Sequence, residues 1–474
     1  MQKKKKSARP LKTSAFPLGE WPPGGRAGMK SSWIPCNWLQ DYVGFLLTKT
    51  HPWGMLVAIR ALQASSDAII PCEGDDAGAH DRENRRSGEM NLTVPAPNIT
   101  DRQFVKPLLC GPGPCDLLPS VVEALTRPTL SPICDELFNV LDDIRTGIQY
   151  MFQTRSNTVL AVSGSGHLGM ETVITNLVEP NETLLIASRG IWDERALLIA
   201  KRRGIKTVVT KVPYTDTFSF DHLEAMLKKV RPTALFITHG DSSTGSMQKI
   251  EGLGKLCHKY GALLLVDTVV SISGVPFLMD EWEVDGVYTS TQKALSGPAG
   301  ISPVAFSARA EEKINKRKSE TPFYYDIKLL AVQWNCYGTK KYHHTLSSPL
   351  LWALRCCLQE LAKETLPVSW ERHATVTAHF LKRLQELPVQ LLIPKPEDRL
   401  ATVTTVVLPR GYDYMEFVKY MREKHNILIF AGLGPTEGKA LRIGIMGCNS
   451  SFKVADAIVD AMADTLRALK KSSL

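Results

Sequence analysis

LLLVD at residues 263–267 is the clearest structural signal in the sequence, because four apolar residues lead directly into a carboxylate. A short apolar run is typical of a strand that is buried on both faces of a parallel sheet. An acidic side chain at the end of such a run is costly inside a core and needs a cationic partner. Taken alone, Asp267 fits a helix N-cap or a surface turn as well as a ligand site.

Similar short apolar runs lie on both sides of this one, with helical stretches between most of them. With this one, the runs are 158–162, 183–187, 206–212, 234–238, 262–267 and 286–290. Strands that alternate with helices predict a mostly parallel sheet covered on both faces, and therefore an α/β fold. Apolar residues at three- and four-residue spacing also predict helices over 118–126, 133–152 and 168–178.

The two ends of the chain differ from this pattern. Residues 1–102 begin with a basic stretch and include 73–89, a charged segment almost without apolar residues, so we expect a disordered extension that is a candidate targeting segment. Towards the C-terminus the pattern predicts a long helix from about 342 through 366, strands over 403–408 and 440–445, and a final helix near 454–469. The predicted units are an extension (1–102), a large domain (103–341) and a smaller α+β domain (342–474).

Composition narrows the class of protein. The 474 residues are 44% hydrophobic and 22% charged, which is typical of a globular protein with more than one structural unit. The net charge of +9 fits dispersed surface lysines and arginines better than a nucleic-acid site. No apolar run is long enough to span a membrane. The ten cysteines include no C-x-x-C pair, which indicates reduced thiols and neither a disulfide framework nor a metal site.

A second signal is SGSGH at residues 163–167, which follows the predicted strand 158–162 and precedes a predicted helix. Small residues let the backbone approach an anion, and a helix N-terminus offers free N–H groups. A plain tight turn explains the same residues equally well.

The third signal is STQKAL at residues 290–295, directly after the predicted strand 286–290. Most lysines are solvated, but Lys293 stands among small residues at a strand end, soon after Asp267. A lysine that forms a Schiff base must lie near the carboxylate that holds the cofactor ring. Trp192, after the run 183–187, could stack on such a ring or simply pack in the core.

Across residues 103 to about 470, the chain resembles the alanine–glyoxylate (serine–pyruvate) group of the class V aminotransferases. The matching stretches occur in the order LLCGPGP (108–114), GIQYMFQTR (147–155), SGSGH, THGDSSTG (238–245), LLLVD, STQKAL, YHHT (342–345), TVTTVVLPRGYD (402–413) and GLGPTEGKALRIG (432–444). The resemblance implies fold type I, pyridoxal 5′-phosphate (PLP) as the cofactor, and amino and keto acids as substrates.

The resemblance also implies roles for individual residues. Lys293 would carry PLP as a Schiff base, Asp267 would hold the pyridinium nitrogen, and Arg442 would clamp the substrate carboxylate near Gly111. The residues implied to surround the cofactor are Ser165, Gly166, His167, Trp192, Ser242 and Gln292. Tyr342 and Thr345 match residues that reach the cofactor phosphate of a neighbouring subunit, which implies a homodimer.

The implied reaction transfers an amino group from L-alanine or L-serine to glyoxylate, giving glycine and pyruvate or hydroxypyruvate. A 3-hydroxykynurenine transaminase stays open as an alternative. So does a cysteine desulfurase or lyase, which would need a mobile cysteine such as Cys110 or Cys115. A homologue without catalysis is a third alternative, against which intact Lys293, Asp267 and Arg442 argue.

The chain ends in Ser472-Ser473-Leu474, which partly resembles the S-K-L address read by the peroxisomal import receptor. Prolines in the first 25 residues, such as Pro10 and Pro17, disfavour the long amphipathic helix of a mitochondrial segment. We therefore expect a peroxisomal enzyme, with the mitochondrial matrix as the alternative for forms that carry the extension.

Overall fold

The structure is a computed structural model that describes residues 93–94 and 96–470. The predicted extension, up to residue 92, and the C-terminal address at 472–474 lie outside the described residues. Contacts divide the chain after Thr100, and Asp101–Leu474 is the compact unit that holds the sheets.

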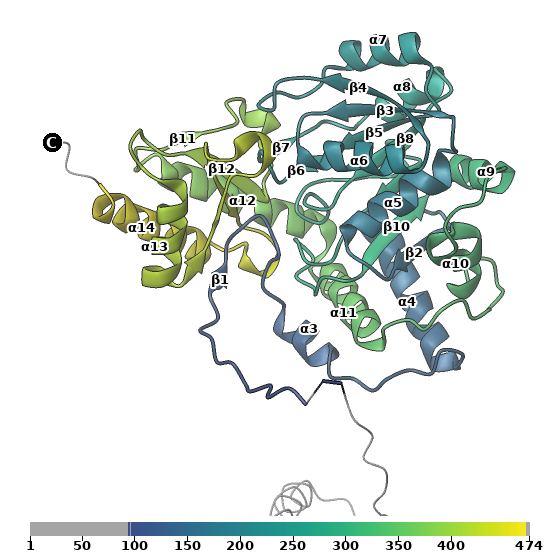
Figure 1. Cartoon of the computed structure of the whole chain (residues 1–474), viewed down its shortest axis with the longest axis horizontal. Helices are drawn as coiled ribbons and strands as arrows, with labels where there is room; N and C mark the ends of the chain where they lie inside the picture. The colour runs from purple at the N-terminus through teal and green to yellow at the C-terminus, as the bar shows by residue number, and fades with distance from the viewer. Residues whose placement is uncertain (1–92, 95, 471–474) are drawn as a thin grey trace, which may run out of the picture. The chain divides into compact units, whose positions relative to one another are not determined.

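A seven-stranded sheet forms the centre of this unit (Figure 1). Its strands, in spatial order, are β2 (Val159–Val162), β10 (Ser302–Phe306), β9 (Gly286–Tyr288), β8 (Leu263–Asp267), β5 (Ala234–Thr238), β3 (Thr183–Ser188) and β4 (Lys206–Lys211). Strands β9, β8, β5, β3 and β4 pair in parallel, and only β10 runs antiparallel to its neighbours. The predicted mostly parallel sheet is therefore confirmed.

Helices cover both faces of this sheet. Successive side chains of a strand point to opposite faces, and every residue of β2, β5, β8, β9 and β10 is buried. The helices of this part are α3 (Pro119–Ala124), α4 (Asp135–Phe152), α5 (Gly166–Leu177), α6 (Ile191–Arg202), α7 (Phe220–Val230), α8 (Leu253–Lys259), α9 (Ala308–Lys316), α10 (Ile327–Gln333) and α11 (Ser348–Glu364).

The predicted helix from residue 342 was wrong over its first six positions, because α11 begins at Ser348. Pro349 lies in its first turn, where a missing backbone N–H costs nothing. In the interior of a longer helix the same proline would remove a hydrogen bond and clash with the preceding turn. The residues before α11 therefore form an irregular segment, which carries Tyr342 and Thr345.

A second, antiparallel sheet lies towards the C-terminus. Its order is β11 (Gln390–Leu391), β12 (Val403–Val407), β15 (Leu441–Gly444) and β14 (Phe430–Ala431). Helices α12 (Leu366–Leu384), α13 (Tyr414–His425) and α14 (Phe452–Ala468) accompany it. Phe380, Phe417 and Ile443 belong to its own hydrophobic cluster, whereas α11 contributes to the cluster of the large sheet. The predicted domain division at 341/342 stays a prediction.

The N-terminal part of the compact unit joins this smaller sheet region. Strand β1 (Leu108–Leu109) pairs in parallel with β13 (Ile427–Leu428), and Cys110 is buried in the second cluster. In the loop that follows, Gly111 packs against Phe430 and Gly113 packs against Lys293.

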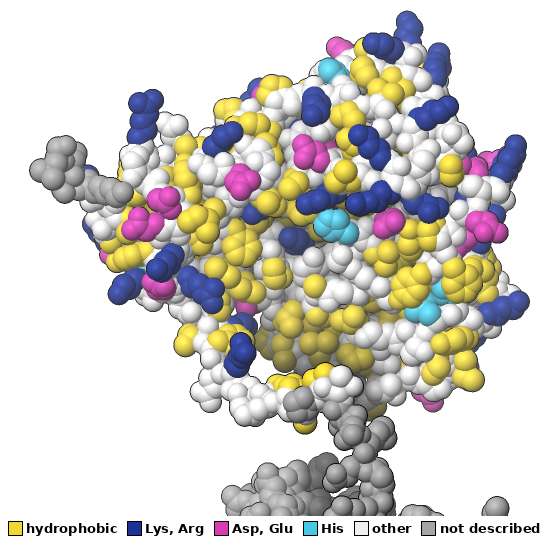
Figure 2. All heavy atoms as spheres, viewed as in Figure 1, with side chains coloured by type: hydrophobic (Ala, Val, Ile, Leu, Met, Phe, Trp, Pro, Cys, Tyr) yellow, Lys and Arg dark blue, Asp and Glu magenta, His cyan; other side chains and the backbone are white. Residues whose placement is uncertain are grey.

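Lys and Arg side chains stand interspersed with Asp and Glu over the face shown in Figure 2. Within residues 93–94 and 96–470, no helix has the length and apolar character that a bilayer crossing requires. The loops that follow β2, β3, β5, β8 and β9 lie at the carboxyl ends of parallel strands, where open α/β sheets bind ligands.

Candidate active site

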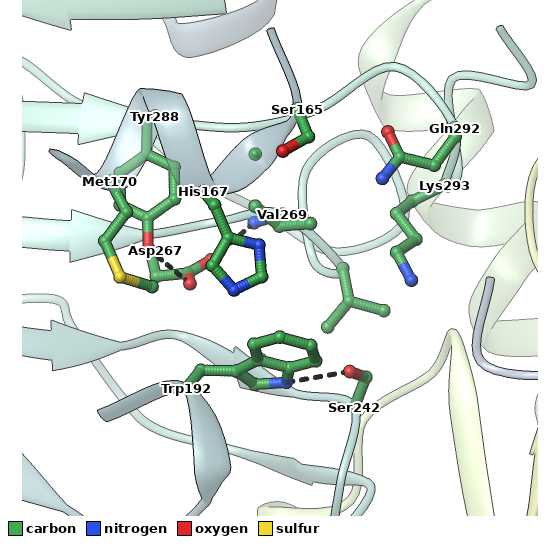
Figure 3. Close-up of a pocket in the computed structure, with 13 residues that line it drawn as sticks. Ser165, His167, Met170, Trp192, Ser242, Asp267, Val269, Tyr288, Gln292 and Lys293 are labelled. Carbon is green, nitrogen blue, oxygen red and sulfur yellow. Dashed lines mark hydrogen bonds between the residues drawn. The ribbon is translucent and has the colours of Figure 1, made fainter. Parts of the chain in front are cut away.

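These loops enclose a pocket that brings together eight of the predicted site residues (Figure 3). They are Ser165, Gly166, His167, Trp192, Ser242, Asp267, Gln292 and Lys293. Each comes from the carboxyl end of a strand or from the loop or helix that follows it. The parallel strands thus bring residues that are far apart in the sequence together in one site.

Asp267 ends β8 with its carboxylate buried and hydrogen-bonded on both oxygens. The Tyr288 hydroxyl donates to Oδ2 at 2.5 Å, and the Val269 amide donates to Oδ1 at 2.8 Å (Figure 3). Burial raises the pKa of Asp267 to about 7, although both hydrogen bonds act in the opposite direction. Neither donor is a cation, so a ligand with a positive charge beside Asp267 would stabilise the ionised form.

We expect Asp267→Asn to stabilise the protein when no cofactor is bound. The folded pKa of about 7 exceeds the value of about 3.9 in an unfolded chain. The folded state then binds the proton more tightly, so the free energy of unfolding falls as the pH rises between these values. The variant should avoid this loss of up to about 4 kcal/mol at pH 8. Thermal melts at pH 5 and 8 measure the effect, and the same difference in Tm at both pH values would contradict it.

Lys293 lies on the turn after β9 and points into the pocket (Figure 3). Its Nζ donates to the Pro112 carbonyl at 2.6 Å, and a Cβ on Gly113 would lie only 2.2 Å from that nitrogen. A larger residue would displace the lysine side chain, and the φ of +110° at Gly113 also favours glycine. Burial, followed by the positive charge of Arg442, lowers the pKa of Lys293 to about 8. A sizeable neutral fraction near neutral pH suits an amine that attacks a carbonyl.

The N-terminus of α5 also lines the pocket. Ser165 is the N-cap, but its hydroxyl makes no capping hydrogen bond, so it is available to a ligand. A Cβ on Gly166 would lie 3.2 Å from a Val269 methyl carbon, so only a small residue fits here without displacement. Free N–H groups and the positive end of the helix dipole favour an anionic group at this position.

Trp192, in the first turn of α6, lines the same pocket. Its indole Nε1 donates to the Ser242 hydroxyl at 2.9 Å, which fixes the plane of the ring (Figure 3). His167 meets it edge-on, with ring centroids 5.7 Å apart, and burial lowers the pKa of His167. A fixed, planar aromatic beside a neutral imidazole is suited to a flat ligand.

The donor set fits PLP. A buried carboxylate suits the ring nitrogen, a lysine with a lowered pKa suits the aldehyde carbon, and a helix N-terminus suits the phosphate. Asp267, Lys293 and Ser165 supply these three groups in one pocket. The individual roles stay predictions.

Arg442 and Gly111 lie near the pocket without lining it. Arg442 is buried on β15, where Nη1 donates to the Ser242 carbonyl at 3.3 Å and Nε donates to the Ala431 carbonyl at 2.9 Å. Burial lowers its pKa to about 10, a value at which it is still charged at neutral pH. Gly111 packs against Gly444, where a Cβ would lie 2.0 Å from the Gly111 oxygen.

Tyr342 and Thr345 are not brought into this pocket. Their hydroxyl groups hydrogen-bond to each other at 2.9 Å, and Tyr342 is 54% exposed. Both lie on the irregular segment before α11.

Several residues of the pocket were not predicted from the sequence: Met170, Gly240, Val269, Val270 and Tyr288. Tyr288 matters most because it holds Asp267. It stands opposite Asp267 in the parallel register of β8 and β9. A tyrosine inside an otherwise apolar strand is a signal, but only the register identifies its partner.

Comparisons with known proteins agree with this geometry. The family described as aminotransferase class V matches residues 126–453. An alanine–glyoxylate aminotransferase of Rattus norvegicus is 41% identical over 82% of this chain and 95% of its own length. One of Drosophila melanogaster is 38% identical over 80% and 98%. The crystal structure of an alanine–glyoxylate aminotransferase from Nostoc sp. matches with a TM-score of 0.76 and 36% identity, over 78% of this chain and 98% of that one.

Proposed function

The chain belongs to the class V aminotransferase family, and on this premise we propose that it transfers the amino group of L-alanine or L-serine to glyoxylate. The products are glycine and pyruvate or hydroxypyruvate. The observation that carries the proposal is the pocket that joins Lys293, Asp267 and the N-terminus of α5, in a chain 41% identical to an alanine–glyoxylate aminotransferase.

Enzymes of this family depend on PLP, which acts as an electron sink when its ring nitrogen is protonated. Lys293 would hold the cofactor, and its amine would move the proton from the substrate Cα. Its depressed pKa suits this role, because a base works best when its pKa is near the working pH. Asp267 keeps the proton on the ring nitrogen.

Arg442 binds the substrate carboxylate in this proposal. A guanidinium forms two parallel hydrogen bonds to a carboxylate and so fixes its orientation. The hydrogen bond from Nε to Ala431 leaves the outer nitrogens to do this, at the cost of the Nη1 contact with Ser242.

A panel of amino donors with glyoxylate as the acceptor tests the proposed reaction. L-alanine and L-serine should give turnover well above that with L-aspartate or L-cysteine. Turnover that depends on 3-hydroxykynurenine instead would assign the alternative transaminase activity. Release of sulfide from cysteine would indicate a desulfurase, but Cys110 and Cys115 are both buried, which argues against a mobile nucleophile.

Arg442→Ala should lower kcat/KM for every amino and keto acid while leaving the absorbance of the bound cofactor unchanged. Loss of one partner of a buried charge-assisted pair costs about 2–5 kcal/mol. Arg442→Lys is the matched control and should recover little, because an ammonium group cannot form the same paired contact. Unchanged kcat/KM for all carboxylate substrates would refute the clamp.

We also propose that the enzyme is a homodimer in which Tyr342 and Thr345 reach the cofactor phosphate of the partner. The exposed hydroxyl pair on an irregular segment outside its own pocket supports this arrangement. Light scattering of purified protein gives the mass. Tyr342→Phe together with Thr345→Val should weaken cofactor binding without changing the mass of a dimer.

The peroxisome is the proposed compartment, with the mitochondrial matrix as the alternative. A receptor that reads the free C-terminus can act on a folded protein, so residues 90–474 should go to peroxisomal puncta. The same chain without Ser472–Leu474 should be diffuse. Fluorescence microscopy compares the two, and an identical pattern for both would remove the tail as an address.

A further inference from the structure

Two cysteine thiols meet behind the turn that carries Lys293, and the proposed transamination uses neither. Cys115 follows the Gly111–Pro114 loop, and Cys448 lies in the short helix η4 (Gly447–Asn449) after β15. The Ser296 hydroxyl lies between them, 2.7 Å from the Cys448 amide and 3.7 Å from the Cys115 sulfur. The Cys448 thiol donates to the Asp116 carbonyl at 3.2 Å and the Cys115 thiol to the Met446 carbonyl, so each sulfur contacts the segment that carries the other cysteine.

The thiols differ in their access to solvent. Cys115 is 4% exposed, and its sulfur donates to the Met446 carbonyl at 3.0 Å. Cys448 is only partly buried and lines a cavity of about 410 Å³ together with Arg372 and Glu364. A small polar molecule in this cavity therefore reaches Cys448 first, with Cys115 directly behind it.

The more accessible thiol, Cys448, is also the more acidic of the two. Contact with Cys115 lowers the pKa of Cys448, and contact with Cys448, with burial, raises the pKa of Cys115. The thiolate is the reactive form of cysteine, so Cys448 is the better nucleophile of the two.

We propose that Cys448 and Cys115 form an oxidation site for hydroperoxides, which convert the pair into a disulfide. The Cys448 thiolate attacks the outer oxygen of the hydroperoxide, so that an S–O bond forms and the O–O bond breaks. The remaining alkoxide or hydroxide leaves with a proton, and Cys448 becomes a sulfenic acid.

Cys115 completes the reaction. Its sulfur attacks the Cys448 sulfur, so that the S–S bond forms and the S–O bond breaks, and the departing hydroxide takes the Cys115 proton as water. The two thiols lose two electrons, and the peroxide gains them to give an alcohol, or water from hydrogen peroxide, plus a second water. Dithiothreitol reverses the change by thiol–disulfide exchange.

Formation of the disulfide should also displace Lys293. The Cys115 amide donates to the Gln292 carbonyl at 2.8 Å, and Pro112 accepts from the lysine Nζ. A bond to Cys448 withdraws the Cys115 sulfur from Met446 and moves this segment. Displacement of a reacting group by about 1 Å can cost roughly 100-fold in rate, so oxidation should lower activity by roughly tenfold or more.

The test treats purified full-length holoenzyme with a small excess of hydrogen peroxide. Peptide mapping without reduction should find Cys115 joined to Cys448, and dithiothreitol should restore both thiols and the activity. Cys115→Ser should stop at a Cys448 sulfenic acid that dimedone traps, whereas Cys448→Ser should leave Cys115 unmodified. These chemical readouts do not depend on which amino acid is the substrate.

Cys134→Ser is the matched control, because Cys134 is also partly buried but only caps helix α4. This variant should oxidise at Cys448 as the wild type does. In the Cys115→Ser variant, which keeps Cys134, dimedone labelling of Cys134 as fast as Cys448 would overturn the proposal. Oxidation of Cys448 without a bond to Cys115 would overturn it as well.

Discussion

Lys293→Ala is expected to fold normally but to lack both the visible absorbance of a lysine-bound cofactor and nearly all turnover. The side chain lies in the pocket, with its amine on the Pro112 carbonyl, so its removal leaves the sheet intact. A positioned proton-transfer group contributes roughly 10²–10⁴-fold to a rate. Loss of covalent attachment adds to this, so kcat should fall by at least about 10³-fold.

Absorbance spectra and single-turnover rates with L-alanine measure this prediction, and circular dichroism checks the fold. Lys316→Ala is the control, because Lys316 is an exposed residue of α9 paired with Glu312. It should keep the wild-type spectrum and rate. Wild-type absorbance in Lys293→Ala would mean that another amine holds the cofactor.

The central sheet was predictable because its strands are short, apolar and buried on both faces. The run 234–238 has the bounds of β5, and 262–267 exceeds β8 by one residue. Strand β10 was not predicted, since Pro303 lies within it and proline lacks the N–H that a ladder uses. Its pairing with β2 and β9 stabilises the strand despite this, which only the tertiary structure reveals.

The site was predictable to the extent that its residues stand at strand ends. Lys293 and Asp267 each follow an apolar run, and parallel strands bring such positions to one edge of the sheet. Tyr288 was missed because its role depends on the register of β8 against β9. The contacts between the Cys115 and Cys448 segments join opposite ends of the described chain, and no local pattern predicts them.

Asp267→Asn is expected to retain PLP but to lose most of its turnover. An ionised carboxylate holds the proton on the ring nitrogen, whereas an amide cannot supply the charge. Removing one partner of a buried ion pair costs about 3–5 kcal/mol. If this free energy is lost in the transition state, the rate of proton transfer from Cα should fall by about 10² to several thousand-fold.

The same substitution should have opposite effects on the two forms of the protein. Without cofactor, Asp267→Asn removes a buried carboxylate whose pKa burial has raised, and the Tyr288 hydroxyl can still hydrogen-bond to the new amide. With cofactor, the ion pair is lost, so binding should raise Tm less than in the wild type. Melts with and without PLP, beside rates measured with α-deuterated L-alanine, separate these effects. Normal turnover with PLP bound would show that Asp267 is not the partner of the ring nitrogen.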